Sequence, residues 1–373
     1  MINRIEHSNL RSQEKSLDIW LLMSALALVL IGLIVIYDAS IVTAFRDFND
    51  KFHFLKNQLV WAVLGTVALS LFSFFDYHKL IKFGSHTLAG SLLFLLLVLI
   101  PHIGTEILGA KRWINIEGFT FQPSEFAKLA VVFYATFIMS KFHNFKMRLV
   151  DTLVVYFLPI LIITGLVVIQ PDLGTALIFF GLTVVIYFLG NAPFWHFLLA
   201  IPVIVLGAIA AVIKEPYRIE RIKAFMDPAY DPLGASYQIN QIIIALSSGG
   251  LLGVGAGASR SKFEFIPEIH SDAIFAVIVE EVGFLGGLTL IALFVFLLTR
   301  AIKIAKEAPD YEGKILAGGI VGLIGMQIVL NLSAIVALVP LTGIPLPFIS
   351  YGGSSLFVTL ISIGILLNIK KQS

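Results

Sequence analysis

Long apolar stretches dominate the chain, and short polar segments separate them. Each stretch reaches or approaches the roughly 20 helical residues needed to cross a hydrocarbon core about 30 Å thick. The pattern therefore predicts an all-α polytopic membrane protein with about ten transmembrane helices, which form one integral membrane domain over residues 1–373. The predicted helices cover residues 17–40, 56–75, 83–101, 123–140, 152–169, 174–190, 194–213, 272–299, 314–338 and 352–369.

Residues 214–271 form a long segment that does not fit this pattern. A charged piece opens it, an Asp/Pro turn region follows at 227–232, and an amphipathic stretch at 237–246 leads into a glycine-rich run at 249–257. The apolar part is too short and too interrupted by glycine to span a membrane. It predicts a short interfacial or re-entrant helix, whose backbone must be satisfied by protein or by a wet cavity. We therefore expect one large extracytoplasmic loop containing such helices.

Composition supports the membrane assignment and excludes several kinds of site and partner. Hydrophobic residues make up 58% of the chain and charged residues 13%, which is about half the charged share of a soluble domain. The chain has no cysteine, and this excludes disulfides, thiolate metal sites and cysteine nucleophiles. A net charge of +2 without a Lys/Arg run predicts no nucleic-acid partner. The first apolar stretch is too long for a signal peptide and lacks a cleavage pattern.

Basic residues cluster at alternate ends of the predicted helices, which sets an orientation by the positive-inside rule. The connections at 170–173 and 339–351 contain neither Lys nor Arg. Both termini are therefore predicted to be cytoplasmic, and the loop 214–271 is predicted to lie outside. The basic residues assigned to the cytoplasmic side are Arg4, Arg11, Lys15, Lys79, Lys82, Lys141, Lys146, Arg148, Arg300, Lys303, Lys306, Lys314, Lys370 and Lys371.

Two adjacent cations precede the fourth predicted helix. Lys111 and Arg112 lie next to Trp113, and a guanidinium fork beside an ammonium point charge suits a phosphate group. Basic residues with a Trp are equally typical of an anchor at the depth of lipid headgroups. The residues alone leave both interpretations open.

Ionisable side chains within the predicted helices are costly in a membrane and are therefore candidates for function. Lys128 follows Glu125 by one helical turn, so the two can form a structural ion pair; a substrate contact is the alternative. Glu280 and Glu281 lie about two turns into a later helix, where each must be paired, protonated or in contact with water. Lys128 is also the predicted partner of one of these two acids.

Asp272 stands at the expected outer mouth of that later helix. Ser271 could cap the helix and place Asp272 in its first turn, where the helix dipole favours a carboxylate. This position suits chemistry better than the buried pair of acids does, and His270 beside it could assist or be a bystander. Asp172 occupies a similar outer helix start, after a break at 170–171.

The segment 339–355 contains three prolines and three glycines, so it cannot continue a helix. It carries no charge, and we expect it to dip back into the protein and shape a cavity together with the stretch 237–257. Gly253, Gly255 and Gly257 loosely resemble a dinucleotide-binding loop, but no βαβ pattern surrounds them.

These segments, in this order, resemble the SEDS family of shape, elongation, division and sporulation proteins, typified by RodA and FtsW, and several details are closer to FtsW. Ala273 and the pair Leu332-Ser333 stand where the family usually has Phe and Gly, and neither departure touches a charged position. The matching segments, spread over most of the chain, are Gly109–Ile114, Gln122–Leu129, Gln170–Thr175, Tyr217–Phe225, Asp231–Gln238, Pro267–Glu281 and Pro345–Ser355.

The resemblance implies a peptidoglycan glycosyltransferase that polymerises lipid II at the outer face of the bacterial cytoplasmic membrane. It implies Asp272 as the essential acid, a class B penicillin-binding transpeptidase as partner, and contacts with other proteins of a division or elongation complex. A carboxylate general base suits an inverting attack by a sugar hydroxyl on a lipid-linked disaccharide. The departing pyrophosphate needs cations rather than a proton.

Further candidate residues follow from that chemistry. The candidate pyrophosphate ligands are Lys111, Arg112, Arg218 and Arg221. Other candidate substrate-binding residues are Tyr237, Gln238, His270 and Ser350. Structural roles around the site are expected for Glu125, Lys128, Asp172, Glu280 and Glu281. No motif for a metal or other cofactor is evident, although Mg²⁺ or Mn²⁺ could assist.

Two alternatives come from other functional classes. A transporter could move lipid II across the membrane without bond chemistry, since broken helices and intramembrane charge also suit transporters. The acid lies at one membrane face and no inverted repeat is visible, which favours the enzyme. A non-catalytic scaffold of a cell-wall synthase complex is the third possibility, and it would leave Asp272 dispensable.

Overall fold

The computed structural model describes residues 17–107, 110–116, 119–143, 147–214, 216–227, 229–234, 236–260, 262 and 270–373. Of the residues used above, Arg4, Arg11, Lys15, Gly109, Lys146 and 267–269 lie outside these ranges.

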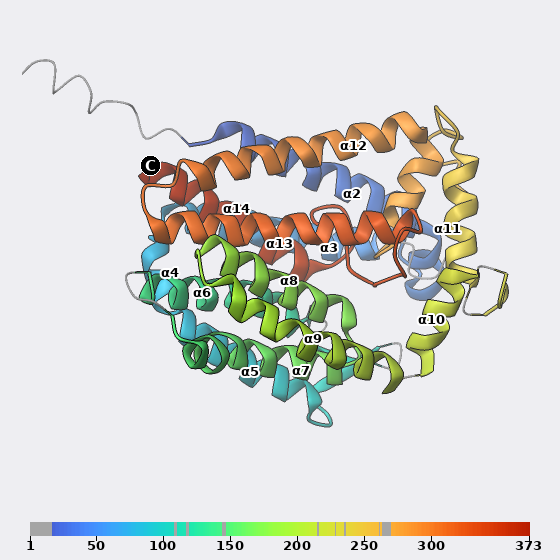
Figure 1. Cartoon of the computed structure of the whole chain (residues 1–373). Coiled ribbons are helices and arrows are strands. Elements are labelled where there is room, and N and C mark those ends of the chain that lie inside the picture. The colour runs from blue at the N-terminus through green and yellow to red at the C-terminus, as the bar shows by residue number, and fades with distance from the viewer. Residues whose placement is uncertain are drawn as a thin grey trace, which may run out of the picture.

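A helix occupies each of the ten predicted positions, and the long helices run side by side along the bundle (Figure 1). Within the described ranges, six helical segments are long and apolar enough to cross a membrane: α2, α3, η1 with α7, α12, α13 and α14. The long helices are α2 (Ile19–Phe48), α3 (His53–Phe74), α5 (Gly84–Leu99), α6 (Pro123–Lys141), the π-helix η1 (Asp151–Phe157) continued by α7 (Leu158–Ile169), α8 (Leu173–Leu189), α9 (Phe194–Lys214), α12 (Ile274–Lys306), α13 (Tyr311–Ile335) and α14 (Gly353–Gln372). The shorter helices are α4 (Tyr77–Lys82), α10 (Pro216–Met226) and α11 (Tyr237–Ser248).

The last helix forms the centre of the bundle. Nearly every residue of α14 is buried, and its most extensive packing is against α3. Small residues allow this close approach, because a Cβ atom on Gly364 would lie only 3.0 Å from the Cα atom of Leu69. Outer helices instead expose large apolar side chains, including Ile34 and Phe74. This distribution suits a bundle surrounded by hydrocarbon, since a surface in water carries far fewer such groups in contiguous patches.

The prediction of an all-α chain is wrong between α5 and α6, where the structure contains a small antiparallel sheet. Its strands are β1 (Gly104–Ile107), β2 (Ala110–Ile116) and β3 (Phe119–Phe121), in the order β1-β2-β3. Ile114 pairs with Gly104 on one side and with Phe121 on the other. The segment is too short for a spanning helix, and its β-branched and aromatic residues favour strands.

Helix α12 is interrupted at Gly283, which has φ 76° and ψ −176°. The glycine-rich run after α11 supplies the partners that the helix loses at this point. The amide of Val254 donates to the Glu280 carbonyl at 2.9 Å, and the amide of Phe284 donates to the Gly250 carbonyl at 2.9 Å. Backbone groups of the glycine-rich run and of α12 thus form hydrogen bonds with each other, as irregular backbone inside an apolar bundle requires.

The segment between α13 and α14 enters the bundle without forming a helix or strand. Its side chains Ile344, Leu346 and Ile349 are buried, and its carbonyls lie directly against Gly32 of α2. The segment reverses direction at Gly343 and Phe348, which have φ values of 68° and 67°. We call residues 336–352 the proline loop. It lies at the same end of the bundle as α10 and α11, opposite the C-terminus (Figure 1).

Replacing Gly364 by alanine should destabilise the bundle, because the added methyl group forces α14 away from the backbone of α3. Overpacking of this kind typically costs about 1–3 kcal/mol, so the thermal unfolding midpoint in detergent should fall. Gly90→Ala in α5 is the matched control, since nothing lies within 4 Å of its added Cβ atom; its midpoint should be unchanged or higher. Equal midpoints for both variants would contradict the packing argument.

Candidate active site

Asp272 lies in the turn that leads into α12. The helix begins at Ile274 with Ala273 as its N-cap, so the prediction that Ser271 caps the helix and that Asp272 belongs to its first turn is wrong. Asp272 is partly exposed and borders a cavity of about 10 Å³. This volume is about that of one water molecule.

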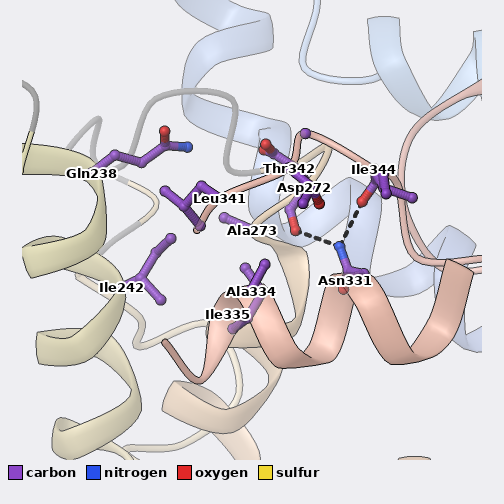
Figure 2. Close-up of a pocket in the computed structure, with 11 residues that line it drawn as sticks. Gln238, Ile242, Asp272, Ala273, Asn331, Ala334, Ile335, Leu341, Thr342 and Ile344 are labelled. Atoms are coloured by element: carbon purple, nitrogen blue, oxygen red, sulfur yellow. Dashed lines mark hydrogen bonds between the residues drawn. The ribbon is translucent and has the colours of Figure 1, made fainter. Parts of the chain in front are cut away.

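Three further elements enclose this cavity (Figure 2). Helix α11 contributes Gln238, so this predicted substrate-binding residue does lie beside Asp272, whereas Tyr237 is not among the lining residues. Helix α13 contributes Asn331, and the proline loop contributes Thr342, which lies next to Asp272 in the close-up. The remaining lining residues are Ile242, Ala273, Ala334, Ile335, Leu341, Gly343 and Ile344.

His270 is buried on the other side of the same turn. Its ring lies 4.4 Å from the ring of Phe54 and 5.5 Å from the ring of Tyr351, measured between centroids. Burial lowers the pKa of His270 to about 4, so the ring is neutral near pH 7. His270 therefore cannot offer a positive charge to a pyrophosphate, and its position favours a packing role.

Ser350 and its neighbours hold the end of the proline loop in place. The Ser350 hydroxyl oxygen accepts a hydrogen bond from the Leu346 amide at 2.8 Å. Gln58 of α3 donates to the Ser350 carbonyl at 3.4 Å and accepts from the Gly352 amide at 3.2 Å. Ser350 is buried. Its hydroxyl group is bonded within its own loop and its carbonyl group is bonded to α3.

Two of the predicted cations bond to carbonyls at the end of α7 and in the turn that follows it. Arg112 of β2 donates to the Gln170 carbonyl at 2.9 Å and also to the Pro171 carbonyl. Arg218 of α10 is buried and donates to the Val168 carbonyl at 3.3 Å. Segments far apart in the sequence are therefore joined here by guanidinium groups, whose planar forks can bridge several acceptors.

The other two predicted cations are more accessible. Arg221 is exposed and donates to the Leu341 carbonyl at 3.2 Å, and Leu341 lines the Asp272 cavity. Lys111 pairs across the sheet with Glu106 in backbone register, yet within the described residues its ammonium group has no ion pair or hydrogen bond. Lys111 and Arg221 are thus the members of the set best able to contact a ligand.

Asp172 connects this turn to the proline loop. Its carboxylate caps α8 by accepting from the Thr175 amide at 3.1 Å. The next residue but one, Gly174, lies so close to the proline loop that a Cβ atom would come within 2.6 Å of the Thr342 carbonyl. The start of α8 therefore supports the segment that lines the Asp272 cavity.

The predicted ion pair between Glu125 and Lys128 is confirmed. The Lys128 Nζ atom lies 2.7 Å from Glu125 Oε1, and only 1% of Lys128 and 3% of Glu125 are exposed. A buried charge of this kind needs its partner, because an unpaired ion loses its hydration without compensation.

The prediction that Lys128 pairs with Glu280 or Glu281 is wrong. Glu281 instead lies 3.4 Å from the ammonium group of Lys262, which also contacts Asp38 of α2 at 3.1 Å. Glu280 accepts hydrogen bonds from the Ser259 hydroxyl and the Arg260 amide. The partners come from the segment after the glycine-rich run, and the sequence pattern gave no indication that this segment folds onto α12.

Sequence reasoning also missed Asn331, Thr342 and Gln58. Asn331 and Gln58 are polar residues inside predicted spanning helices, and such residues are a signal in themselves even where they are not ionisable. No cluster of three or more His, Cys, Asp or Glu side chains in the described part of the chain could hold a metal ion.

Lys128→Met should unfold the protein readily, because it leaves the Glu125 carboxylate buried without a partner. The expected loss is about 3–5 kcal/mol, measured by denaturant unfolding in detergent. The double variant Glu125→Gln/Lys128→Met should recover most of this loss. Lys56→Met is the control, since it breaks an exposed pair with Asp50 and should cost at most about 1 kcal/mol. A double variant no more stable than Lys128→Met would disprove the assigned pairing.

Comparison with known proteins gives a consistent result over nearly the whole chain. A family described as cell cycle proteins, which comprises FtsW, RodA and SpoVE, matches residues 19–373. Stage V sporulation protein E of Bacillus subtilis is 40% identical over 366 residues, which cover 97% of this chain and 99% of that protein. A probable peptidoglycan glycosyltransferase FtsW of Trichlorobacter lovleyi is 39% identical and covers 94% of this chain and 92% of its own.

Solved structures agree with this result. One chain from a peptidoglycan synthase complex, described as coordinating polymerisation and crosslinking, is 30% identical, with a TM-score of 0.78 and coverage of 96% of this chain and 98% of that chain. The rod shape determining protein RodA of Thermus thermophilus is 27% identical, with a TM-score of 0.69 and coverage of 96% and 97%. With its apolar helices, the chain is a multi-pass membrane protein. It belongs to the FtsW, RodA and SpoVE family of cell cycle proteins.

Proposed function

We propose that this protein is a peptidoglycan glycosyltransferase that polymerises lipid II into glycan strands. The names of its relatives support this activity. The observation that carries the proposal is the position of Asp272, a carboxylate at the rim of the bundle beside a loop that also contacts a cation. In the proposed orientation, ten helices cross the bacterial cytoplasmic membrane, both termini are cytoplasmic, and the Asp272 end faces outward.

The proposed reaction joins two lipid-linked saccharides at this end. Asp272 accepts the proton of a sugar hydroxyl while that oxygen attacks the anomeric carbon of the second substrate. The bond from the anomeric carbon to the polyprenyl pyrophosphate breaks with inversion, and the pyrophosphate leaves with its own negative charge. Cations placed near the departing pyrophosphate lower the barrier, because they stabilise the negative charge as that charge develops.

We propose different roles for the four cations. Lys111 and Arg221 contact the pyrophosphate, because Lys111 has no partner among the described side chains and Arg221 is exposed next to the cavity wall. Arg112 positions the turn before α8 and Arg218 holds the last turn of α7, since their guanidinium groups already donate to carbonyls there.

The proposed partner is a class B penicillin-binding transpeptidase, with other proteins of a division, elongation or sporulation complex. The similarity to a chain of a peptidoglycan synthase complex supports this partner. Assistance by Mg²⁺ or Mn²⁺ stays a prediction, to be tested by assays with and without a chelator.

A lipid II transporter is the second candidate, and one observation favours it. Helix α12 is interrupted at Gly283, next to the partly buried group formed by Asp38, Lys262 and Glu281, and broken helices with internal charge are typical of transporters. Supplying lipid II directly to the outward face of proteoliposomes distinguishes the two. Only a polymerase makes glycan strands there.

Asp272→Asn should reduce polymerisation by about 10²–10⁴-fold, which is the usual contribution of a general base. The measurement is gel analysis of glycan products from purified protein and lipid II, with and without the transpeptidase partner. Asp227→Asn is the control, because Asp227 is an exposed acid after α10 that caps its own turn; its product yield should match the wild type. Glycan strands made by the Asp272→Asn protein at the wild-type rate would refute the assignment of the base.

Lys111→Met should affect the kinetics and leave the stability unchanged, whereas Arg112→Met should lower the stability. Lys111→Met removes a cation that has no partner among the described residues, so kcat/KM should fall about tenfold while the unfolding midpoint stays constant. Arg112→Met removes the donor to two carbonyls in the turn before α8, so its midpoint should fall by several degrees. Both quantities are measured on the same preparations. A lowered midpoint for Lys111→Met with unchanged kinetics would reverse the proposed roles.

A further inference from the structure

Asn331 is a buried amide at the junction of three elements near the candidate base. It belongs to α13 and is only 2% exposed. Its Nδ2 atom donates to the Asp272 carbonyl at 2.9 Å and to the Ile344 carbonyl at 2.8 Å, and both hydrogen bonds are visible in Figure 2. An amide has two N–H hydrogens, so these two contacts use its whole donor capacity at near-ideal length.

The two acceptors belong to segments that need an external donor. Asp272 lies before α12, which begins at Ile274, and the first turn of the helix uses the next carbonyl, because the Ala276 amide donates to the Ala273 carbonyl at 3.0 Å. The Asp272 carbonyl receives a hydrogen bond from Asn331, which belongs to a different helix. Ile344 lies in the proline loop, which has no regular backbone pairing of its own. One side chain thus ties the turn before α12 to the loop that faces the Asp272 carboxylate.

A second contact joins the same two segments on the other side of Ser271. The Tyr351 amide donates to the His270 carbonyl at 2.9 Å. The turn is therefore held at both His270 and Asp272, and the Asn331 contact acts directly on the residue that carries the candidate base. The Asp272 carbonyl belongs to the backbone from which its side chain departs, so the Asn331 contact restrains the position of the Cα–Cβ bond and limits the rotamers open to the carboxylate.

We propose that Asn331 is a positioning residue, which orients Asp272 for proton abstraction by holding its carbonyl against the proline loop. This inference rests on the proposed function of Asp272 as base. A misplacement of about 1 Å in a reacting group can lower a rate by about 10²-fold. Loss of the amide should therefore act mainly on the chemical step, because both N–H groups of Asn331 already bond to main-chain carbonyls.

The test compares Asn331→Leu with Asn368→Leu. Asn368 is a buried asparagine of α14 that also bonds to main-chain groups, at Ser73 and Tyr77, near the opposite end of the bundle. Both variants should lose similar stability. Only Asn331→Leu should lower kcat, by about 10–100-fold with KM within twofold of the wild type, and only this variant should shift the acidic limb of the pH profile of kcat. Asn331→Ser, a milder change whose short hydroxyl cannot bridge both carbonyls, should give an intermediate kcat.

Hydrogen exchange provides a readout that does not depend on activity. Peptides covering residues 270–276 should exchange faster in Asn331→Leu or Asn331→Ser than in the wild type, and Asn368→Leu should leave them unchanged. Unchanged exchange in this segment would overturn the inference, as would equal kinetic effects of the two leucine variants. A wild-type protein that makes no polymer would refute the proposed function instead, and the exchange data would still decide whether Asn331 holds the turn.

Discussion

An apolar bundle imposes one requirement on every departure from helical structure: each displaced backbone group must find its partner inside the protein. Three departures meet this requirement in different ways. The break in α12 at Gly283 pairs with the glycine-rich run, the turn after α7 receives guanidinium groups, and the proline loop receives the amides of Asn331 and Gln58. The candidate site lies where the last two meet, so its architecture follows from backbone satisfaction as much as from chemistry.

Charge in this protein falls into two groups with different surroundings. Glu125 and Lys128 form a matched pair within the bundle, whereas Glu281 shares the single cation Lys262 with Asp38. Other cations bond to neutral carbonyls, as Arg221 does, or have no partner among the described groups, as Lys111 does. These two side chains are therefore able to meet the negative charge of the proposed leaving group.

Sequence alone predicted the helices well and the contacts between them poorly. Span-length apolar runs located all ten long helices, the proline-rich pattern of 339–355 indicated an irregular loop, and the family resemblance is confirmed over residues 19–373. The i,i+3 spacing was enough to pair Lys128 with Glu125, because both lie on one helix. It could not identify Lys262 as the partner of Glu281, or Asn331 as a contact of Asp272, since those pairs form only through tertiary packing. The small sheet was missed because its strands are shorter than any span.

The burial of α14 has a consequence for how the protein is made. α14 is the last helix of this chain, yet its main packing partner is α3, and nearly 300 residues separate them. During synthesis, α3 must wait in the bilayer with its glycine-containing face uncovered until α14 has been inserted. Assembly of the interior is therefore late relative to the insertion of the early helices. Early helices depend on surrounding lipid, or on insertion factors, to prevent premature association with the wrong neighbours.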